Sequence, residues 1–127
     1  MTECRPKILV VDDDEIHLAM VEAILKTEYE IITAKSGKEA LELFLHGPAP
    51  NLIFLDIMMP NMDGWETFNR LKAISLLRNV PIIFLSSVSE TDEVERAYKM
   101  GAAGFIRKPY DKDDLLAKIK KVLNANE

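Results

Sequence analysis

Short runs of apolar and β-branched residues alternate with segments in which apolar residues recur at every third or fourth position. The runs cover residues 8–11, 29–34, 52–55, 82–85 and 105–106. Helical spacing links Leu18, Val21 and Leu25, then Leu41, Phe44 and Leu45, then Phe68 and Leu71, then Val94, Ala97 and Tyr98, and finally Leu115, Leu116, Ile119, Val122 and Leu123. A helix therefore follows each of five predicted strands, a pattern that predicts an α/β fold with a parallel sheet.

The polarity of the runs also predicts the order of the strands. A strand covered by helices on both faces reads as a continuous apolar run, whereas an edge strand can carry polar residues. The first, third and fourth runs are apolar throughout, the second is mixed (YEIITA), and the fifth passes at once into Arg107 and Lys108. We therefore expect the order 2-1-3-4-5, with a ligand-binding crevice beyond the carboxyl ends of strands one and three.

Length and charge narrow the class of protein. A chain of 127 residues is expected to form one domain, burying about 65–70% of its unfolded surface. The formal charge is −5, from 16 basic and 21 acidic residues spread along the chain, which argues against direct binding to nucleic acid or membrane surfaces. Cys4 is the only cysteine, and no signal peptide or long apolar span is present in the sequence. We expect a cytoplasmic protein with a protein partner or a small ligand.

Reactive side chains follow four of the predicted strands. They are, in chain order, Asp12 and Asp13, Asp56, Ser86 and Ser87, and Lys108. Because the carboxyl ends of parallel strands lie at one edge of a sheet, we expect these side chains to converge. Clustered carboxylates repel one another unless a cation compensates them, and oxygen-only ligands favour a hard ion such as Mg²⁺.

This combination of groups predicts phosphoryl transfer. A cation, an ammonium group and a hydroxyl would together stabilise the three equatorial oxygens of a transferring phosphoryl group. Asp56, which ends the apolar run in NLIFLDIMMP, is the carboxylate placed to act as the nucleophile. The sequence therefore indicates transfer of a phosphoryl group to an aspartate.

Four segments strongly resemble the receiver domain of two-component response regulators, including chemotaxis receivers. They are VDDD at 11–14, LDIMMPNMDG at 55–64, PIIFLSS at 81–87 and GFIRKPY at 104–110, in the order and at the spacing of that family. The resemblance implies a flavodoxin-like doubly wound (βα)5 fold and a single receiver domain over residues 1–127, with a core at about 7–123. It also implies a signalling domain rather than an enzyme, with self-catalysed phosphorylation and slow autodephosphorylation.

The resemblance further implies roles for the acidic residues. Asp56 would accept a phosphoryl group from the phosphohistidine of a sensor histidine kinase or a histidine phosphotransfer protein. Asp13 and Asp56 would bind Mg²⁺ directly, with Mn²⁺ as a possible substitute, and Asp12 would act mainly through metal-bound water. The backbone carbonyl of Met58 would be the remaining protein ligand.

Residues near strands four and five would carry the signal. Lys108 is expected to contact the phosphoryl group, and Ser86 to rotate and bond it. Phe105 matches the family's aromatic switch residue, which is often Tyr, and it lacks the phenolic hydroxyl. The surface of helix four, strand five and helix five would then change for an unidentified protein target. The resemblance also implies a cis peptide between Lys108 and Pro109.

Two other functions stay open at this point. Asp12-x-Asp14 resembles the nucleophile and acid pair of haloacid-dehalogenase-type phosphatases, although Glu15-Ile16 follow where that family usually has Gly-Thr. The second is a receiver fold that only docks to a partner, without phosphorylation.

Several polar residues are expected to have structural roles only. Ser36 and Asp111 are placed to cap the helices that follow them, and Asp14 is expected to be a first-turn acid. His17 and His46 have no second ligand at a metal-binding spacing, so we expect them at the surface.

Overall fold

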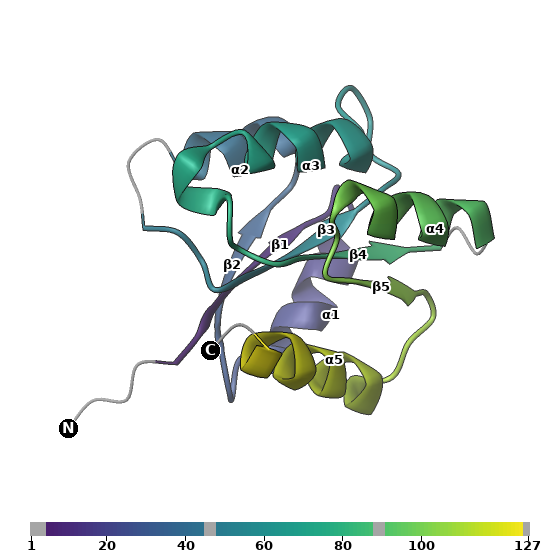
Figure 1. Ribbon diagram of the computed structural model, residues 1–127. Coiled ribbons are helices and arrows are strands. Elements are labelled where there is room, and N and C mark those ends of the chain that lie inside the picture. The colour runs from purple at the N-terminus through teal and green to yellow at the C-terminus, as the bar shows by residue number, and fades with distance from the viewer. Residues whose placement is uncertain (1–4, 45–47, 88–90, 126–127) are drawn as a thin grey trace.

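The computed structural model describes residues 5–44, 48–87 and 91–125, which form a single sheet flanked by helices (Figure 1). The strands are β1 (Lys7–Val11), β2 (Glu30–Ala34), β3 (Leu52–Asp56), β4 (Ile82–Ser86) and β5 (Gly104–Arg107). The helices are α1 (Glu15–Leu25), α2 (Gly37–Leu43), α3 (Gly64–Lys72), α4 (Thr91–Met100) and α5 (Lys112–Ala125), with a short 3₁₀ helix at Ser75–Leu77. The predicted alternation of strands and helices is therefore confirmed.

The five strands are parallel and lie in the order β2-β1-β3-β4-β5, as predicted. Every residue of β3 and β4 is buried, whereas β2 is exposed at Glu30 and half-buried over its next three residues. β2 begins one residue later than predicted because the backbone N–H of Tyr29 still bonds to Leu25 at the end of α1. The polarity of each run thus reports its place in the sheet.

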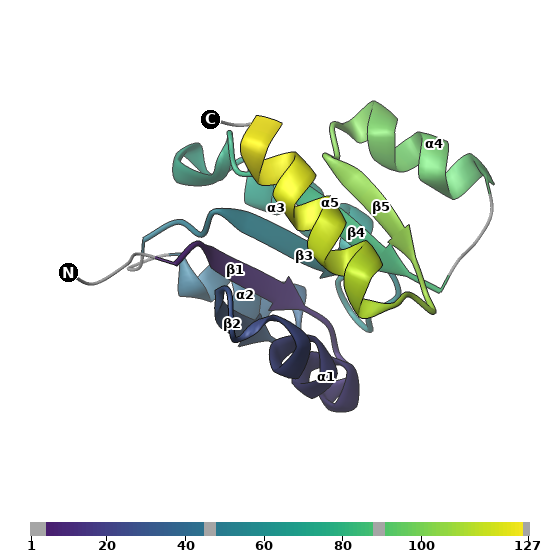
Figure 2. The same cartoon turned by 90° about the horizontal axis from the view of Figure 1, so that it is seen from below.

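Helices cover both faces of the sheet. Figure 1 shows α2, α3 and α4 on one face and α1 and α5 on the other, and Figure 2 views the molecule from the α1 and α5 side. Side chains alternate between the faces along each strand. Leu9 and Ile53 pack in the core beneath α2, α3 and α4, whereas their neighbours Ile8 and Phe54 pack in the core beneath α1 and α5. The resulting three layers fix the position of each strand end.

Side-chain caps set where the helices begin. Ser36 accepts the backbone N–H of Glu39, and Asp111 accepts that of Asp114, so both predicted caps are confirmed. Asp14 is the N-cap of α1 rather than a first-turn acid. Leu45 and His46 lie outside the described residues. Within the described ranges, no helix combines the length and the apolar character that crossing a membrane requires.

Candidate functional site

Three carboxylates meet at the carboxyl end of the sheet, where strand order reverses between β1 and β3. Asp12 and Asp13 follow β1, and Asp56 is the last residue of β3. One oxygen of each lies within 4.8 Å of the other two. Asp12 and Asp56 are only 2% and 7% exposed, whereas Asp13 is exposed at the rim. The convergence predicted from the sequence is therefore present.

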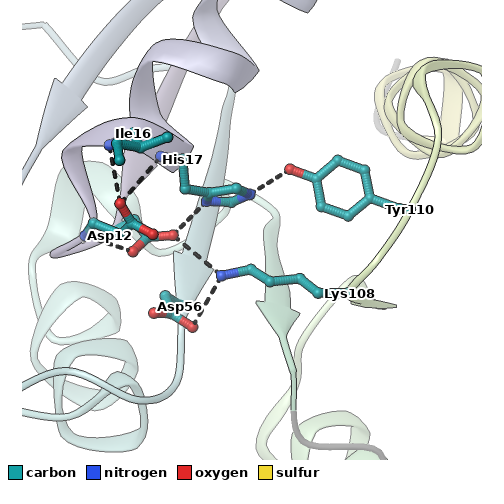
Figure 3. A network of polar contacts seen from close by, with 7 residues as sticks. Asp12, Ile16, His17, Asp56, Lys108 and Tyr110 are labelled. Carbon is teal, nitrogen blue, oxygen red and sulfur yellow. Dashed lines mark hydrogen bonds and ion pairs between the residues drawn. The ribbon is translucent and has the colours of Figure 1, made fainter.

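Lys108 brings a positive charge to these carboxylates. Its Nζ lies 3.3 Å from Oδ2 of Asp12 and 3.8 Å from Oδ1 of Asp56 (Figure 3). The backbone N–H of Lys108 donates to the carbonyl of Ser86, at 2.8 Å, which ties the end of β5 to the end of β4. The peptide bond between Lys108 and Pro109 is cis, as the resemblance implies.

Asp56 has an unusually weak acidity for an aspartate. Burial, and then the charges of Asp12 and Asp13, raise the pKa of Asp56 to about 6. The charge of Lys108 and a hydrogen bond from the backbone N–H of Met58 act in the opposite direction without cancelling the increase. The single ammonium group therefore leaves negative charge uncompensated when Asp56 ionises.

Replacing Asp56 with asparagine is expected to stabilise the metal-free protein at pH 7.5. Because its folded-state pKa is raised from 3.8, the stabilisation from protonated Asp56 is complete below about pH 3.8 and lost as pH rises through about 6. Ionised Asp56 thus costs on the order of 2–3 kcal/mol, which the neutral amide of Asp56→Asn avoids. Thermal unfolding in EDTA should show a higher Tm for the variant at pH 7.5 but not at pH 4. An equal or lower Tm at pH 7.5 would contradict this expectation.

His17 belongs to the same polar cluster, so its predicted surface position is wrong. It is 8% exposed, its Nδ1 is hydrogen-bonded to Oδ2 of Asp12, and its Nε2 lies 2.5 Å from the hydroxyl of Tyr110 (Figure 3). His17 precedes Val21 by four residues and Leu25 by eight, so helical spacing placed it on the buried face of α1. Tyr110 follows β5, and nothing local to either residue predicts the contact.

The environment keeps Asp12 ionised and Tyr110 protonated. Burial acts to raise the pKa of Asp12, but hydrogen bonds from His17 and the backbone N–H of Asp14, with the charge of Lys108, lower it below its ordinary value. Burial, followed by the charge of Asp12, raises the pKa of Tyr110 to about 12. At neutral pH, Asp12 therefore accepts hydrogen bonds, and the Tyr110 hydroxyl keeps its proton.

The loop from β3 to α3 packs closely against the site. A Cβ on Gly64 would lie 2.3 Å from the backbone oxygen of Asp56 and 2.6 Å from the Cα of Ile57, so α3 can begin here only with glycine. The backbone N–H of Gly64 donates to the carbonyl of Ile57 at 2.8 Å. Met58 lies on this loop with its side chain exposed. The glycine contact therefore fixes the backbone that carries Asp56 and Met58.

Ser86 and Phe105 lie on neighbouring strands beside the site. Ser86 is fully buried at the end of β4, and Phe105, on β5, is 9% exposed. Phe105 pairs in register with Phe84, their ring centroids 6.4 Å apart. The Phe84 ring also lies 5.0 Å from Trp65 of α3, and the guanidinium of Arg96, on α4, lies 4.2 Å from the Trp65 ring centroid. Ring–ring contacts thus connect β5 with α3, and a cation–π contact continues to α4.

The donor set suits a hard divalent cation. Asp12, Asp13 and Asp56 offer carboxylate oxygens, and no nitrogen or sulfur donor belongs to this group among the described residues. Magnesium and similar ions prefer such oxygen ligands. A cation would also compensate the negative charge that raises the pKa of Asp56. The residues present therefore fit a Mg²⁺ site.

Sequence comparison agrees with this geometry. The model of a family described as the response regulator receiver domain matches residues 8–120. The two-component response regulator ORR5 from Oryza sativa subsp. japonica is 32% identical over 119 residues, which cover 93% of this chain and 89% of that protein. The transcriptional regulatory protein CrdR of Helicobacter pylori is 34% identical over 121 residues, but this chain spans only 56% of its length.

Structural comparison gives the same result. The chemotaxis protein CheY4 of Vibrio cholerae superposes with a TM-score of 0.86 at 29% sequence identity. The match covers 93% of this chain and 98% of CheY4. The similarity therefore extends over the whole three-layer fold rather than over the acidic cluster alone.

Proposed function

Because the chain belongs to the family of response regulator receiver domains, the signalling domains of two-component systems, we propose that Asp56 accepts a phosphoryl group. The donor would be the phosphohistidine of a sensor histidine kinase or a histidine phosphotransfer protein. One observation carries the proposal: Asp56 is a buried carboxylate with a pKa raised to about 6, placed between two other carboxylates and the Lys108 ammonium group. The Lys108 ammonium group and a bound cation would favour the ionised carboxylate, which is the form that attacks phosphorus.

Asp12, Asp13 and Asp56 would hold Mg²⁺, or Mn²⁺ in its place, with the backbone carbonyl of Met58 as the remaining protein ligand. When bound, the cation supplies positive charge that offsets the carboxylates and the transferring phosphoryl oxygens. The oxygen-only cluster within 4.8 Å supports this assignment.

The chain's own residues would perform the transfer. A carboxylate oxygen of Asp56 attacks phosphorus while the bond from phosphorus to the histidine nitrogen breaks, and that nitrogen leaves with the electron pair. Lys108, whose Nζ lies 3.8 Å from Asp56 Oδ1, would contact the phosphoryl oxygens, and the Ser86 hydroxyl would donate a hydrogen bond to them. Attack of water on the acyl phosphate would later restore the free carboxylate of Asp56.

Incubation with acetyl phosphate and Mg²⁺ tests the proposal. We expect mass spectrometry to show one added phosphoryl group per chain, and EDTA to prevent the addition. Borohydride reduction of the acyl phosphate should then place homoserine at position 56 in peptide maps. If saturating acetyl phosphate and Mg²⁺ add no mass, the phosphoacceptor proposal is wrong, and a receiver fold that only docks is favoured.

The phosphatase alternative has less support. The Asp14 carboxylate accepts the backbone N–H groups of Ile16 and His17, so it caps α1 rather than pairing with Asp12. Steady turnover of a generic phosphomonoester, abolished by Asp12→Asn but not by Asp56→Asn, would favour the phosphatase instead.

We also propose that phosphorylation changes the surface formed by α4, β5 and α5, to which an unidentified protein target binds. A groove of about 480 Å³ lies on this surface. Its lining residues are Val94, Phe105, Ile106, Arg107, Tyr110, Asp114 and Lys118. Phe105 both lines the groove and packs against Phe84, so a movement of its ring would alter the core and the surface together.

Ser86→Ala should weaken the coupling between the site and this surface. With beryllofluoride as the phosphoryl mimic, we expect the amide NMR signals of residues 91–108 to shift in the wild type. In Ser86→Ala, these shifts should be about half as large or smaller. Mg²⁺ affinity should change little, since the hydroxyl is not a metal ligand. Ser75→Ala serves as a control, because Ser75 is exposed at the surface. If the mimic perturbs only residues adjoining Asp56, equally in wild type and Ser86→Ala, the proposed relay is wrong.

A further inference from the structure

Tyr110, His17 and Asp12 form a continuous chain of hydrogen bonds that the phosphoryl-transfer proposal does not use (Figure 3). His17 lies on α1, and Tyr110, 93 residues later, lies between β5 and α5. Their rings meet edge to face, with centroids 5.8 Å apart and an interplanar angle of 72°. The chain therefore joins the acidic cluster to the segment that leads into α5.

The ionised Asp12 carboxylate fixes the direction of its hydrogen bond with His17. An ionised carboxylate can only accept, so the proton facing Asp12 must sit on Nδ1 of His17. In a neutral imidazole, Nε2 is then an acceptor, and the Tyr110 hydroxyl is placed to donate to it. In that state, donation from Tyr110 would favour the tautomer in which His17 donates to Asp12.

The same bonds restrict the rotation of the Asp12 carboxylate. Oδ1 accepts the backbone N–H of Asp14 at 2.9 Å, and Oδ2 accepts from His17 and from Lys108. Asp12 is only 2% exposed, so water has little access to replace a lost donor. The His17 ring is also anchored at Nε2 by the Tyr110 hydroxyl, so both ring nitrogens of this donor have a partner.

We propose that His17, locked by Tyr110, is a positioning residue that fixes the orientation of Asp12 and so sets the affinity of the acidic cluster for a divalent cation. The inference rests on the proposed function, in which Asp12 belongs to the cation site. Hydrogen-bond partners of metal ligands typically contribute 10–100-fold to affinity. Because Tyr110 also lines the groove between α4, β5 and α5, the same chain connects the cation site with that surface.

Three substitutions separate positioning from packing. His17→Asn keeps an N–H near the position of Nδ1 but cannot reach Tyr110, whereas His17→Leu fills the space without a donor. Tyr110→Phe removes only the hydroxyl. We expect Mg²⁺ affinity to fall about 10-fold in His17→Leu and about threefold or less in His17→Asn and Tyr110→Phe. If His17 only packs, Mg²⁺ affinity should fall more in His17→Asn than in His17→Leu, because leucine suits a buried site better than asparagine.

Mg²⁺ titrations followed by the amide NMR signals of Asp13 and Ile57 measure these affinities. Thermal unfolding ranks the stability of the same variants. Long-range proton–nitrogen spectra of the His17 ring should show a protonated Nδ1 and an unprotonated Nε2 in the wild type, and a mixture of tautomers in Tyr110→Phe.

Affinity in His17→Leu within about twofold of wild type, or a ring protonated at Nε2 in the wild type, would overturn the inference. If His17→Leu does not fold, Tyr110→Phe decides: an unchanged tautomer together with unchanged affinity overturns it. If the wild type binds no Mg²⁺, the proposed cation site itself fails. The ring spectra distinguish that failure, because they report on His17 and Tyr110 without any metal.

Discussion

Replacing Asp56 with asparagine is expected to lower phosphorylation by acetyl phosphate or a cognate kinase at least about 1000-fold. Asparagine has nearly the same size and can still accept the backbone N–H of Met58, but it has no anionic oxygen to attack phosphorus. The fold should persist, because the substitution removes a buried charge that burial and Asp12 disfavour. Loss of labelling in Asp56→Asn would therefore reflect lost chemistry rather than unfolding.

Intact-mass spectrometry after incubation with acetyl phosphate and Mg²⁺ provides the measurement. Asp113→Asn is a matched control, since Asp113 is an exposed acid in the first turn of α5 and should leave labelling unchanged. Single-site labelling that persists in Asp56→Asn would reject Asp56 as the acceptor.

Lys108→Ala is expected to reduce labelling about 100-fold while Mg²⁺ still binds. The ammonium group lies close to Asp12 and Asp56, where it would meet the transferring phosphoryl oxygens. Removing it leaves the carboxylates with less positive charge nearby, so the attraction of the cluster for a cation should not decrease. The loss would thus appear in the transfer step rather than in cation binding.

Lys120→Ala offers a control, because Lys120 is an exposed lysine on α5 that forms an ion pair with Glu28, away from the acidic cluster. Labelling rates and Mg²⁺ titrations should be measured on both variants and the wild type. Unchanged labelling in Lys108→Ala, together with unchanged amide shifts on addition of beryllofluoride, would count against the proposed role of Lys108.

The fold could be predicted because the polarity of each strand's residues indicates whether the strand lies at the edge or at the centre of the sheet. The mixed run at β2 and the short run at β5 mark the edges, and the uninterrupted apolar runs of β3 and β4 mark the centre. The proximity of Asp12 and Asp56 could be predicted from the same pattern. Asp12 follows β1 and Asp56 is the last residue of β3, and these strands are neighbours across the point where the strand order reverses. The acidic cluster could therefore be predicted from the residues at the strand ends.

The residue positions and contacts that were not predicted depend on how the chain runs between one helix or strand and the next. The helical spacing of α1 could have placed His17 inside, but its partner Tyr110 depends on the course of the chain after β5. Asp14 was predicted to lie in the first turn of this helix, but it is the N-cap residue of α1. The helix therefore begins one residue later than that prediction placed it.

Trp65 is the only tryptophan in the sequence, so the intrinsic indole fluorescence of the protein comes from one position. That indole lies between the Phe84 ring of β4 and the Arg96 guanidinium of α4, and it is 8% exposed. The emission wavelength of an indole depends on nearby charge and water, so a displacement of α4 from α3 would change both around this ring. The protein therefore carries an optical reporter of the α3–α4 contact, readable without any attached dye.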